Sequence, residues 1–368
     1  MKNYTHTTIP VRTLASGQIL NIDVFRFEGD PSVPSAYIQS GMHGAELQGT
    51  AVIDFLIRFF TDHPPKGTVT LVPAANPYAL NNKTGEYTQG RFDPTYGDNW
   101  NRLYWDALNN EDGIDIENLV KTIRSDAQNS IQKILRHELT RKLEQQLQKP
   151  LTEMGYGRKL ALTLQRMAVE ADSVLDLHCA SHSVRHVYAP EYARQTVRYL
   201  NIPYVLFIPN LFAGAMDEAV FCPWWTLSQK LSVPCPVEAY TIELGNQEAY
   251  SAKDARGDAM GIINYLVHRG TCDPIKPKGR DSAESLFACR LQDYKTIYSP
   301  TGGLCEFSTV TGGIVPAQEP LAVILTKAGN EKISVALPYD CIPIVQYSSA
   351  ALHQGVELLK VFSKWEVM

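Results

Sequence analysis

Residues 36–74 read AYIQSGMHGAELQGTAVIDFLIRFFTDHPPKGTVTLVPA, and this stretch decides the fold. It opens with a short apolar run at 36–39, which predicts a buried strand. Apolar residues then recur at a spacing of about four from Leu47 to Phe59, as in an amphipathic helix. Residues 68–74 form a second apolar run. A strand, a helix and a strand at this spacing make a βαβ unit, which implies a parallel pair of strands.

Strands and helices continue to alternate on both sides of this unit. Residues 18–28 alternate apolar and polar side chains, which predicts a half-buried strand in a hairpin with a strand near 7–14. An apolar stripe from Ile131 to Leu147 predicts a helix that Pro150 stops. The chain is therefore predicted to be an α/β protein. The other expected elements are helices within 115–149 and near 157–171 and 258–268, and strands at 174–178, 204–208 and 238–244.

The pattern changes towards the C-terminus. From Tyr298 onwards the apolar runs are short, turns carry Gly-Gly pairs and helical periodicity disappears. Residues 298–324 resemble residues 337–362 in the order of their turns and apolar runs, so the two halves are expected to pack as a small all-β sandwich or barrel. We place a domain boundary in the polar stretch 272–285. The two predicted domains are residues 1–275 and residues 285–368.

The composition excludes several classes of protein. The net charge is -5 and the pI is near 6.0, so we expect neither a nucleic-acid partner nor binding to a membrane surface. The seven cysteines are scattered without a CxxC pair, as is typical of thiols in a reducing compartment. The sequence contains neither a signal-peptide core nor the ~20 apolar residues of a membrane span. We expect a cytoplasmic protein, and the sequence leaves open whether it forms a homo-oligomer.

Two short motifs supply candidate metal ligands. His43 and Glu46 lie between a strand end and a helix start, where residues three apart can face one point. The apolar strand at 174–178 delivers His178 at its carboxyl end, where ligands gather in open α/β sheets. Asp176 precedes it on the same face and is a candidate to orient its ring. Two imidazoles and a carboxylate leave zinc an open position, although either motif alone is more often structural.

Glu243 is the candidate general base. It lies at the end of the apolar strand 238–244, where a glutamate is costly unless it is paired or functional. A carboxylate beside a metal-activated water suits proton transfer. Taken alone, Glu243 is better interpreted as an ordinary strand-end carboxylate that faces solvent.

The long loop-like stretch 76–105 carries candidate substrate contacts. Asn101 and Arg102 are adjacent, and a planar guanidinium beside an amide suits capture of a carboxylate. Arg91 is a candidate for polarising the scissile carbonyl. A structureless stretch of this length is uncommon unless it builds a functional surface. Either arginine taken singly would more often form a surface salt bridge.

The order of these motifs resembles the succinylglutamate desuccinylase/aspartoacylase family, which shares its fold with zinc carboxypeptidases. The resemblance implies a three-layer αβα fold with a mixed, largely parallel sheet, and the C-terminal β segment is similar to the family's appended domain. The helical stretch 103–170 looks enlarged relative to the family. The matching text is GMHGAE at 41–46, NP-x-A at 76–79, Arg91, Asn101-Arg102, DLH at 176–178 and TIELG at 241–245.

The same resemblance implies a function, namely hydrolysis of an amide bond in an N-acyl amino acid or a similar small anionic substrate. A carboxypeptidase that acts on peptides and a non-catalytic binding module on the same fold are the alternatives, and the ligand set would also accept cobalt or manganese. A binding module would have no need of Glu243 as a base, so the presence of Glu243 favours an enzyme. The implied roles are one Zn²⁺ per chain on His43, Glu46 and His178, Glu243 as base and proton shuttle, Arg91 on the carbonyl oxygen, and Asn101 with Arg102 on a substrate carboxylate.

Overall fold

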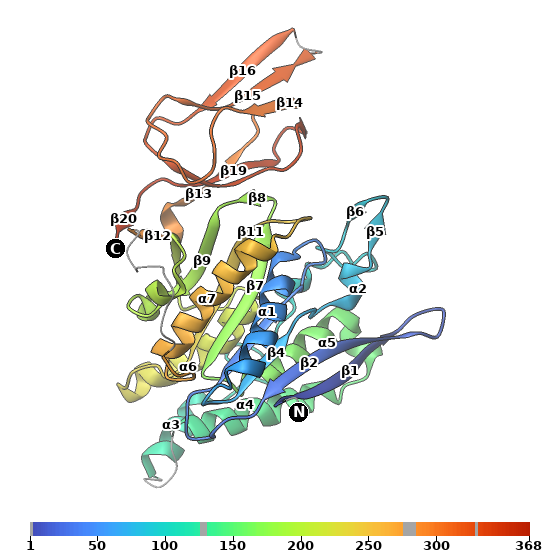
Figure 1. Cartoon of the computed structure of the whole chain (residues 1–368), viewed down its shortest axis with the longest axis vertical. Coiled ribbons are helices and arrows are strands. Elements are labelled where there is room, and N and C mark those ends of the chain that lie inside the picture. Colours follow the sequence, from blue (N-terminus) through green and yellow to red (C-terminus); the bar gives the residue numbers. More distant parts are fainter. Residues whose placement is uncertain (1–2, 126–130, 275–284, 328–329) are drawn as a thin grey trace.

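The computed structural model describes residues 3–125, 131–274, 285–327 and 330–368. Its centre is one large mixed sheet (Figure 1). In spatial order the strands are β1 (Thr5–Thr13), β2 (Ile19–Phe27), β4 (Val69–Val72), β3 (Ala36–Ser40), β7 (Ser173–Ala180), β11 (Glu238–Asn246), β9 (Arg185–Pro190), β10 (Tyr204–Ile208), β12 (Phe287–Arg290) and β20 (Glu366–Val367). Strands β4, β3, β7 and β11 run parallel to one another, as do β9, β10 and β12. The pairs β1–β2, β2–β4, β11–β9 and β12–β20 are antiparallel.

Helices cover both faces of this sheet, with a separate apolar core on each side. One face carries α1 (Gln48–Asp62) and α7 (Ala252–His268), which lie side by side (Figure 1). The other carries α3 (Ile116–Ser125), α4 (Ile131–Leu147), α5 (Leu151–Ala168) and α6 (Met216–Leu231). The predicted three-layer αβα class is therefore confirmed. Shorter pieces are α2 (Pro77–Leu80), β5 (Lys83–Thr84), β6 (Tyr87–Thr88) and the 3-10 turns η1 (Trp100–Arg102), η2 (Glu191–Ala193), η3 (Val197–Leu200) and η4 (Leu291–Asp293).

The strands in the middle of the sheet are mostly apolar because both of their faces are covered. Every residue of β3, β4 and β10 is buried. Their sequences consequently read as mainly apolar runs, with Gln39 and Ser40 in β3 and Thr70 in β4 as exceptions, as expected of parallel strands between two helical layers. Edge strand β1 is mostly exposed and polar.

Some expected elements occur at shifted positions, and several, α6 and β9 among them, were not predicted. The helix expected near 157–171 is the part of α5 that follows Gly155, whose positive φ of 73° interrupts the helix, and a short helical turn from Leu151 precedes it directly after Pro150. The helix expected at 258–268 begins at Ala252, where Ser251 caps it by accepting the backbone N–H of Asp254. Helix α6 escaped prediction because Pro223 and two tryptophans interrupt its pattern, and β9 escaped because it is short and partly polar.

The C-terminal region forms two antiparallel sheets around its own apolar core, as predicted. In the first half of the sequence repeat, β14 pairs with β15 in one sheet, and in the second half β17 pairs with β19 in the other. The two repeated halves therefore supply the middle of opposite sheets. One sheet is β13 (Tyr294–Tyr298), β19 (Glu357–Phe362), β17 (Ile342–Gln346) and β8 (His182–Ser183), and the other is β16 (Glu331–Ala336), β15 (Pro320–Thr326), β14 (Gly303–Phe307) and β18 (Ala351–Leu352).

The large sheet and the C-terminal sheets exchange strands. Strand β8, which follows β7 in the chain, pairs with β17. In return β12 and β20 lie in the large sheet, so the chain ends beside the body of the molecule (Figure 1). The predicted boundary at 272–285 lies mostly on residues 275–284, outside the described residues, and the division at that point stays a prediction. No helix in the described residues is long and apolar enough to cross a membrane.

The buried stripe of α4 offers a test of the helical layer. Leu139 is fully buried, whereas Leu151 at the start of α5 is 49% exposed. We expect Leu139→Ala to lower the free energy of unfolding by about 2–5 kcal/mol, because it leaves a cavity in the core. Leu151→Ala should change it by no more than about 0.5 kcal/mol. Urea unfolding followed by circular dichroism measures both, and equal effects would contradict the burial of α4 within the helical layer.

Candidate metal centre

The turn between β3 and α1 carries two of the predicted metal ligands. A Cβ on Gly44 would lie 2.1 Å from the carbonyl oxygen of Ala79, so only glycine allows this turn to pack on α2. The packing directs His43 and Glu46 inwards, where they are 4% and 2% exposed. Both residues precede α1, so the turn itself, and not a helix face, sets their spacing.

His178 joins them from the neighbouring strand β7, which lies parallel to β3. His178 Nδ1 lies 2.7 Å from Glu46 Oε2, and His43 Nδ1 lies 2.8 Å from Glu46 Oε1. One ligand atom from each of the three residues lies within 4.8 Å of the other two. The structure thus brings the three predicted ligands to one point.

A hydrogen-bond partner at Nε2 of each ring fixes the direction in which Nδ1 of the same ring points. His43 Nε2 lies 2.9 Å from Asn99 Oδ1, an oxygen that also accepts the backbone N–H of Asn101. His178 Nε2 lies 2.9 Å from Asp176 Oδ2. Both Nε2 atoms face acceptors and must therefore donate, which leaves Nδ1 of each ring facing Glu46.

Two nitrogen lone pairs that face one carboxylate repel it unless positive charge lies between them. Burial alone would lower the pKa of His178, but Asp176 and Glu46 raise it well above its usual value, so a proton can supply that charge. Burial alone would raise the pKa of Glu46, but the charges of His43 and His178 lower it. A divalent ion supplies the same charge, so two imidazoles and a carboxylate fit a metal such as zinc.

A buried polar network holds Asp176 from β3. Gln39 Nε2 donates to Asp176 Oδ1 at 2.9 Å and to the Tyr104 hydroxyl at 3.2 Å, and Gln39 Oε1 accepts from the Tyr37 hydroxyl. The sequence singled out Asp176 but missed Gln39 and Asn99. A glutamine in an otherwise apolar strand is a usable signal for Gln39. Nothing distinguishes Asn99 from the other polar residues of its loop.

Glu243 stands beside His178 on β11. It lies opposite His178 in the parallel ladder and opposite His186 in the antiparallel one, so the three side chains share one face of the sheet. Burial, followed by the charge of Glu46, raises the pKa of Glu243 to about 7. Its Oε2 is buried and has no hydrogen-bond partner among the described residues. An acceptor with this pKa suits general-base chemistry near neutral pH.

The predicted substrate contacts surround the same point, with different exposures. Arg91 is 54% exposed, and its Nη1 reaches Glu46 Oε1 at 3.3 Å. Asn101 is buried, with Nδ2 3.4 Å from His178 Nε2 and an Oδ1 for which the described chain offers no partner. Arg102 is exposed and donates from Nη1 to the carbonyl oxygen of Asn101. Arg91 and Asn101 thus touch the ligand cluster, whereas Arg102 lies at its rim.

Two phenols that the sequence did not single out lie near Glu243. Tyr188 lies on β9 and Tyr294 on β13 of the C-terminal sheets, and their ring centroids are 6.5 Å apart. Burial raises the pKa of both hydroxyls, and the charge of Glu243 adds to the shift. The hydroxyl of Tyr294 is buried and unpartnered within the residues that the structure describes. Only the fold could reveal Tyr294, because it lies in the segment assigned to the other predicted domain.

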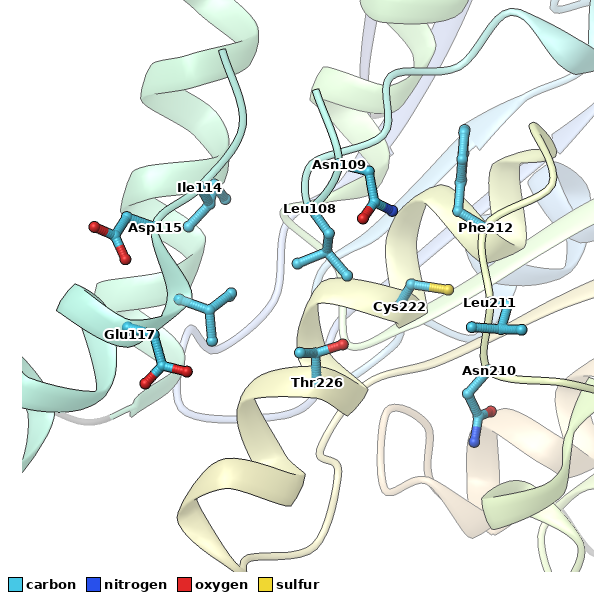
Figure 2. A pocket seen from close by; sticks show the side chains of 11 residues that line it. Leu108, Asn109, Ile114, Asp115, Glu117, Asn210, Leu211, Phe212, Cys222 and Thr226 are labelled. Carbon is cyan, nitrogen blue, oxygen red and sulfur yellow. The ribbon is translucent and has the colours of Figure 1, made fainter. Parts of the chain in front are cut away.

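A separate cavity of about 450 Å³ lies between α3, α6 and the loops before them (Figure 2). Its described lining includes Leu108, Asp115, Leu211 and Phe212. None of the candidate metal ligands or arginines is among these lining residues, so the cavity is distinct from the metal centre.

The chain is similar to known proteins over its whole length. Residues 32–269 match the family model described as the succinylglutamate desuccinylase/aspartoacylase catalytic domain. A solved structure from Shewanella frigidimarina, described as a succinylglutamate desuccinylase/aspartoacylase, is 39% identical with a TM-score of 0.93, and the match covers 100% of this chain and 99% of that one. A family protein from Shewanella amazonensis is also 39% identical, with a TM-score of 0.91 and coverage of 99% and 100%.

A more distant structure shares the fold. The ectoine utilization protein EutE (DoeB) from Ruegeria pomeroyi is 16% identical, with a TM-score of 0.66 and coverage of 99% of each chain. No curated protein matches the chain significantly.

Asp217, in the first turn of α6, gives the site region a stability that depends on pH. It is 2% exposed, and its Oδ1 accepts the backbone N–H of Glu218 at 2.9 Å. Burial, followed by the charge of Glu218, raises its pKa from 3.8 to about 7. The unfolded chain releases this proton at a lower pH than the folded chain does. The folded state therefore loses stability as pH rises from about 4 to about 7 and no further above that.

We expect Asp217→Asn to remove this loss while keeping the acceptor for Glu218. Relative to the unsubstituted protein, the variant should gain about 2–4 kcal/mol in free energy of unfolding at about pH 8, and almost nothing near pH 4. Urea unfolding of the metal-free protein at both pH values measures the difference. A gain that is the same at both pH values would show that Asp217 is ionised in the folded state throughout.

Proposed function

The chain belongs to the succinylglutamate desuccinylase/aspartoacylase family of hydrolytic deacylases, and from that premise we propose that it is a zinc-dependent amide hydrolase. Its substrate would be an N-acyl amino acid or a similar small molecule with a carboxylate. The observation that carries the proposal is the convergence of His43, Glu46 and His178 next to an unpaired Glu243 carboxylate.

The three buried donors would hold the metal through Nδ1 of each imidazole and the Glu46 carboxylate. A zinc ion bound there supplies Lewis acidity that activates a water molecule and polarises the acyl carbonyl. The chain's own part is to keep the donors aligned. Asn99 and Asp176 fix the two rings by accepting from their Nε2 atoms. Cobalt or manganese would be accepted by the same ligands.

Glu243 would move the protons of the reaction. Its side chain shares the face of the sheet with His178, so it would lie beside a water molecule held at the metal centre. With a pKa raised to about 7 it can take a proton from that water and return it to the leaving amine. A carboxylate with the usual pKa would be a weaker base for the first of these steps.

Positive charge around the centre favours an anionic substrate. The Arg91 guanidinium, 3.3 Å from Glu46, is placed to hold the developing negative charge on the carbonyl oxygen. Arg102, at the rim, would recognise a substrate carboxylate, and Asn101 Oδ1, which has no partner in the described chain, would accept from the neighbouring N–H. These contacts favour a substrate that ends in a carboxylate near the scissile bond.

Small substrates are favoured over peptides because the C-terminal sheets approach the centre. Strand β8 begins two residues after β7 and pairs with β17, which holds the C-terminal sheet over the end of the ligand-bearing strand. Tyr294 of that sheet lies beside Tyr188 of β9, with ring centroids 6.5 Å apart. A peptide carboxypeptidase needs an open cleft at this place. A binding module would have no use for a raised-pKa carboxylate beside the ligands.

The assignment of the base is tested by Glu243→Gln. We expect the variant to bind zinc as the unsubstituted protein does and to lose about 10²–10⁴-fold in kcat on an N-acyl amino acid, because the amide cannot take the proton. His178→Ala should lose both metal and activity, and Glu357→Gln on β19 should keep both. Metal analysis of the purified variants is paired with an assay of amine release. Normal hydrolysis by Glu243→Gln would make the proposed mechanism wrong.

The substrate class is tested by Arg102→Ala. We expect kcat/KM for N-acyl amino acids to fall about 10–100-fold, the value of one charge-assisted hydrogen bond. The same variant should barely change kcat/KM for the matching N-acyl amine, which lacks the carboxylate. Arg256→Ala on α7 is the control for a lost surface charge. Equal losses on both substrates would remove Arg102 from carboxylate recognition.

A further inference from the structure

Arg12 of β1 packs against two tyrosine rings on other elements. Its guanidinium carbon is 3.8 Å from the centroid of Tyr78 on α2 and 4.6 Å from that of Tyr156 on α5. Its Nη1 is buried, and no atom of the described chain accepts a hydrogen bond from it. Two aromatic faces therefore take the place of an anion as partners of this charge.

A β-bulge directs Arg12 to this position. The β1–β2 register shifts between Pro10 and Arg12, so that Val11 and Arg12 together oppose Leu20. In a regular strand consecutive side chains point to opposite faces, whereas a bulge can aim two of them to one side. Val11 is 8% exposed in the same core cluster that contains Tyr156. The bulge thus places a charged side chain in the helical layer behind the sheet.

The two tyrosines support a tryptophan that lies between two site residues. Trp100 is fully buried and meets the rings of Tyr78 and Tyr156 edge-on, with centroids 6.3 and 5.8 Å away. Its chain neighbours are Asn99, which accepts from His43 Nε2, and Asn101, which contacts His178. The position of Trp100 therefore sets where both amides lie.

Tyr78 is also connected to the backbone on either side of His43. Tyr78 belongs to α2, which Asn76 caps by accepting the N–H of Ala79. The Asn76 side chain also donates to the carbonyl oxygen of Met42, the residue before His43. The carbonyl of Ala79 packs against Gly44, the residue after His43. Both neighbours of the ligand are thus held by the helix that carries Tyr78.

We propose that Arg12 is a positioning residue for the metal ligand His43. By packing against Tyr78 and Tyr156, whose rings also meet each other edge-on with centroids 5.9 Å apart, it fixes α2 behind the ligand's backbone and Trp100 behind the asparagine that orients its ring. The inference rests on the metal-binding part of the proposed function. It assigns a site role to the N-terminal hairpin, which lies outside the family-matched residues 32–269.

The test measures metal affinity of the folded protein by competition with a chelator. We expect Arg12→Met, which keeps the aliphatic stem and removes the cation, to raise the zinc Kd about 10-fold, the usual effect of losing support behind a ligand. Arg12→Lys should recover part of the affinity. In an Asn99→Ala background Arg12→Met should cause a clearly smaller rise, because the ring's support is already gone. Tyr78→Leu removes one of the two rings that Arg12 contacts, and it should raise the zinc Kd as Arg12→Met does.

The matched control is Arg26→Met on β2, the same change on the other strand of the hairpin. Arg26 donates to Glu28 and Thr70, which lie outside the cluster of Tyr78, Trp100 and Tyr156. We expect it to leave the zinc Kd unchanged, even if it lowers the free energy of unfolding. An unchanged Kd in both Arg12→Met and Tyr78→Leu would overturn the proposal, as would an equal rise in Arg26→Met. Failure of the unsubstituted protein to bind zinc would instead overturn the proposed function.

Discussion

The Glu46 carboxylate lies 2.8 Å from His43 Nδ1 and 2.7 Å from His178 Nδ1, and the Glu46 side chain is almost completely buried. It also accepts the backbone N–H of Cys179 at 3.1 Å and meets Arg91 at 3.3 Å. A buried charge is costly unless such partners surround it. The partners come from the β3–α1 turn, β7 and the loop after β6. Neutralising this one carboxylate therefore ties three distant segments of the chain together.

The register of the large sheet explains why so few strands suffice to build the centre. Gln39, Asp176 and Thr241 are direct neighbours across β3, β7 and β11. One step closer to the carboxyl ends, His178 and Glu243 are neighbours as well. Paired residues of adjacent strands share a face, so each row becomes a continuous line of polar groups. The row with Asp176 orients the ring of His178, and Glu243, the proposed base, lies next to that ring.

Elements from both ends of the chain complete this arrangement. The C-terminal sheets receive β8 from the region after β7 and return β12 and β20 to the large sheet. This exchange brings Tyr294 beside Tyr188 of β9. At the other end, a bulge in β1 sends Arg12 into the layer that supports Trp100. The centre is thus held by segments that precede and follow the family-matched residues.

The sequence by itself determined the βαβ unit, the helical stripe of α4, the all-β character of the C-terminus and the order of the chemical motifs. These features depend on local spacing, because a period of two or of about four already encodes which side of an element is buried. The motif order gave His43, Glu46, His178 and Glu243 as candidates. Taken singly, each of these residues would have been read as structural.

Only the tertiary structure decided which side chains meet. Asn99 faces the ring of His43, and Gln39 holds the aspartate that faces the ring of His178. Tyr294 meets Tyr188 from another sheet, and Arg12 is turned by a bulge. Helix α6 and strand β9 were likewise missed, since neither has a clear period. Strand register, strand exchange and a one-residue bulge are set by pairing between distant segments. No local pattern records such pairing, because its free energy comes from contacts that exist only once the chain has folded.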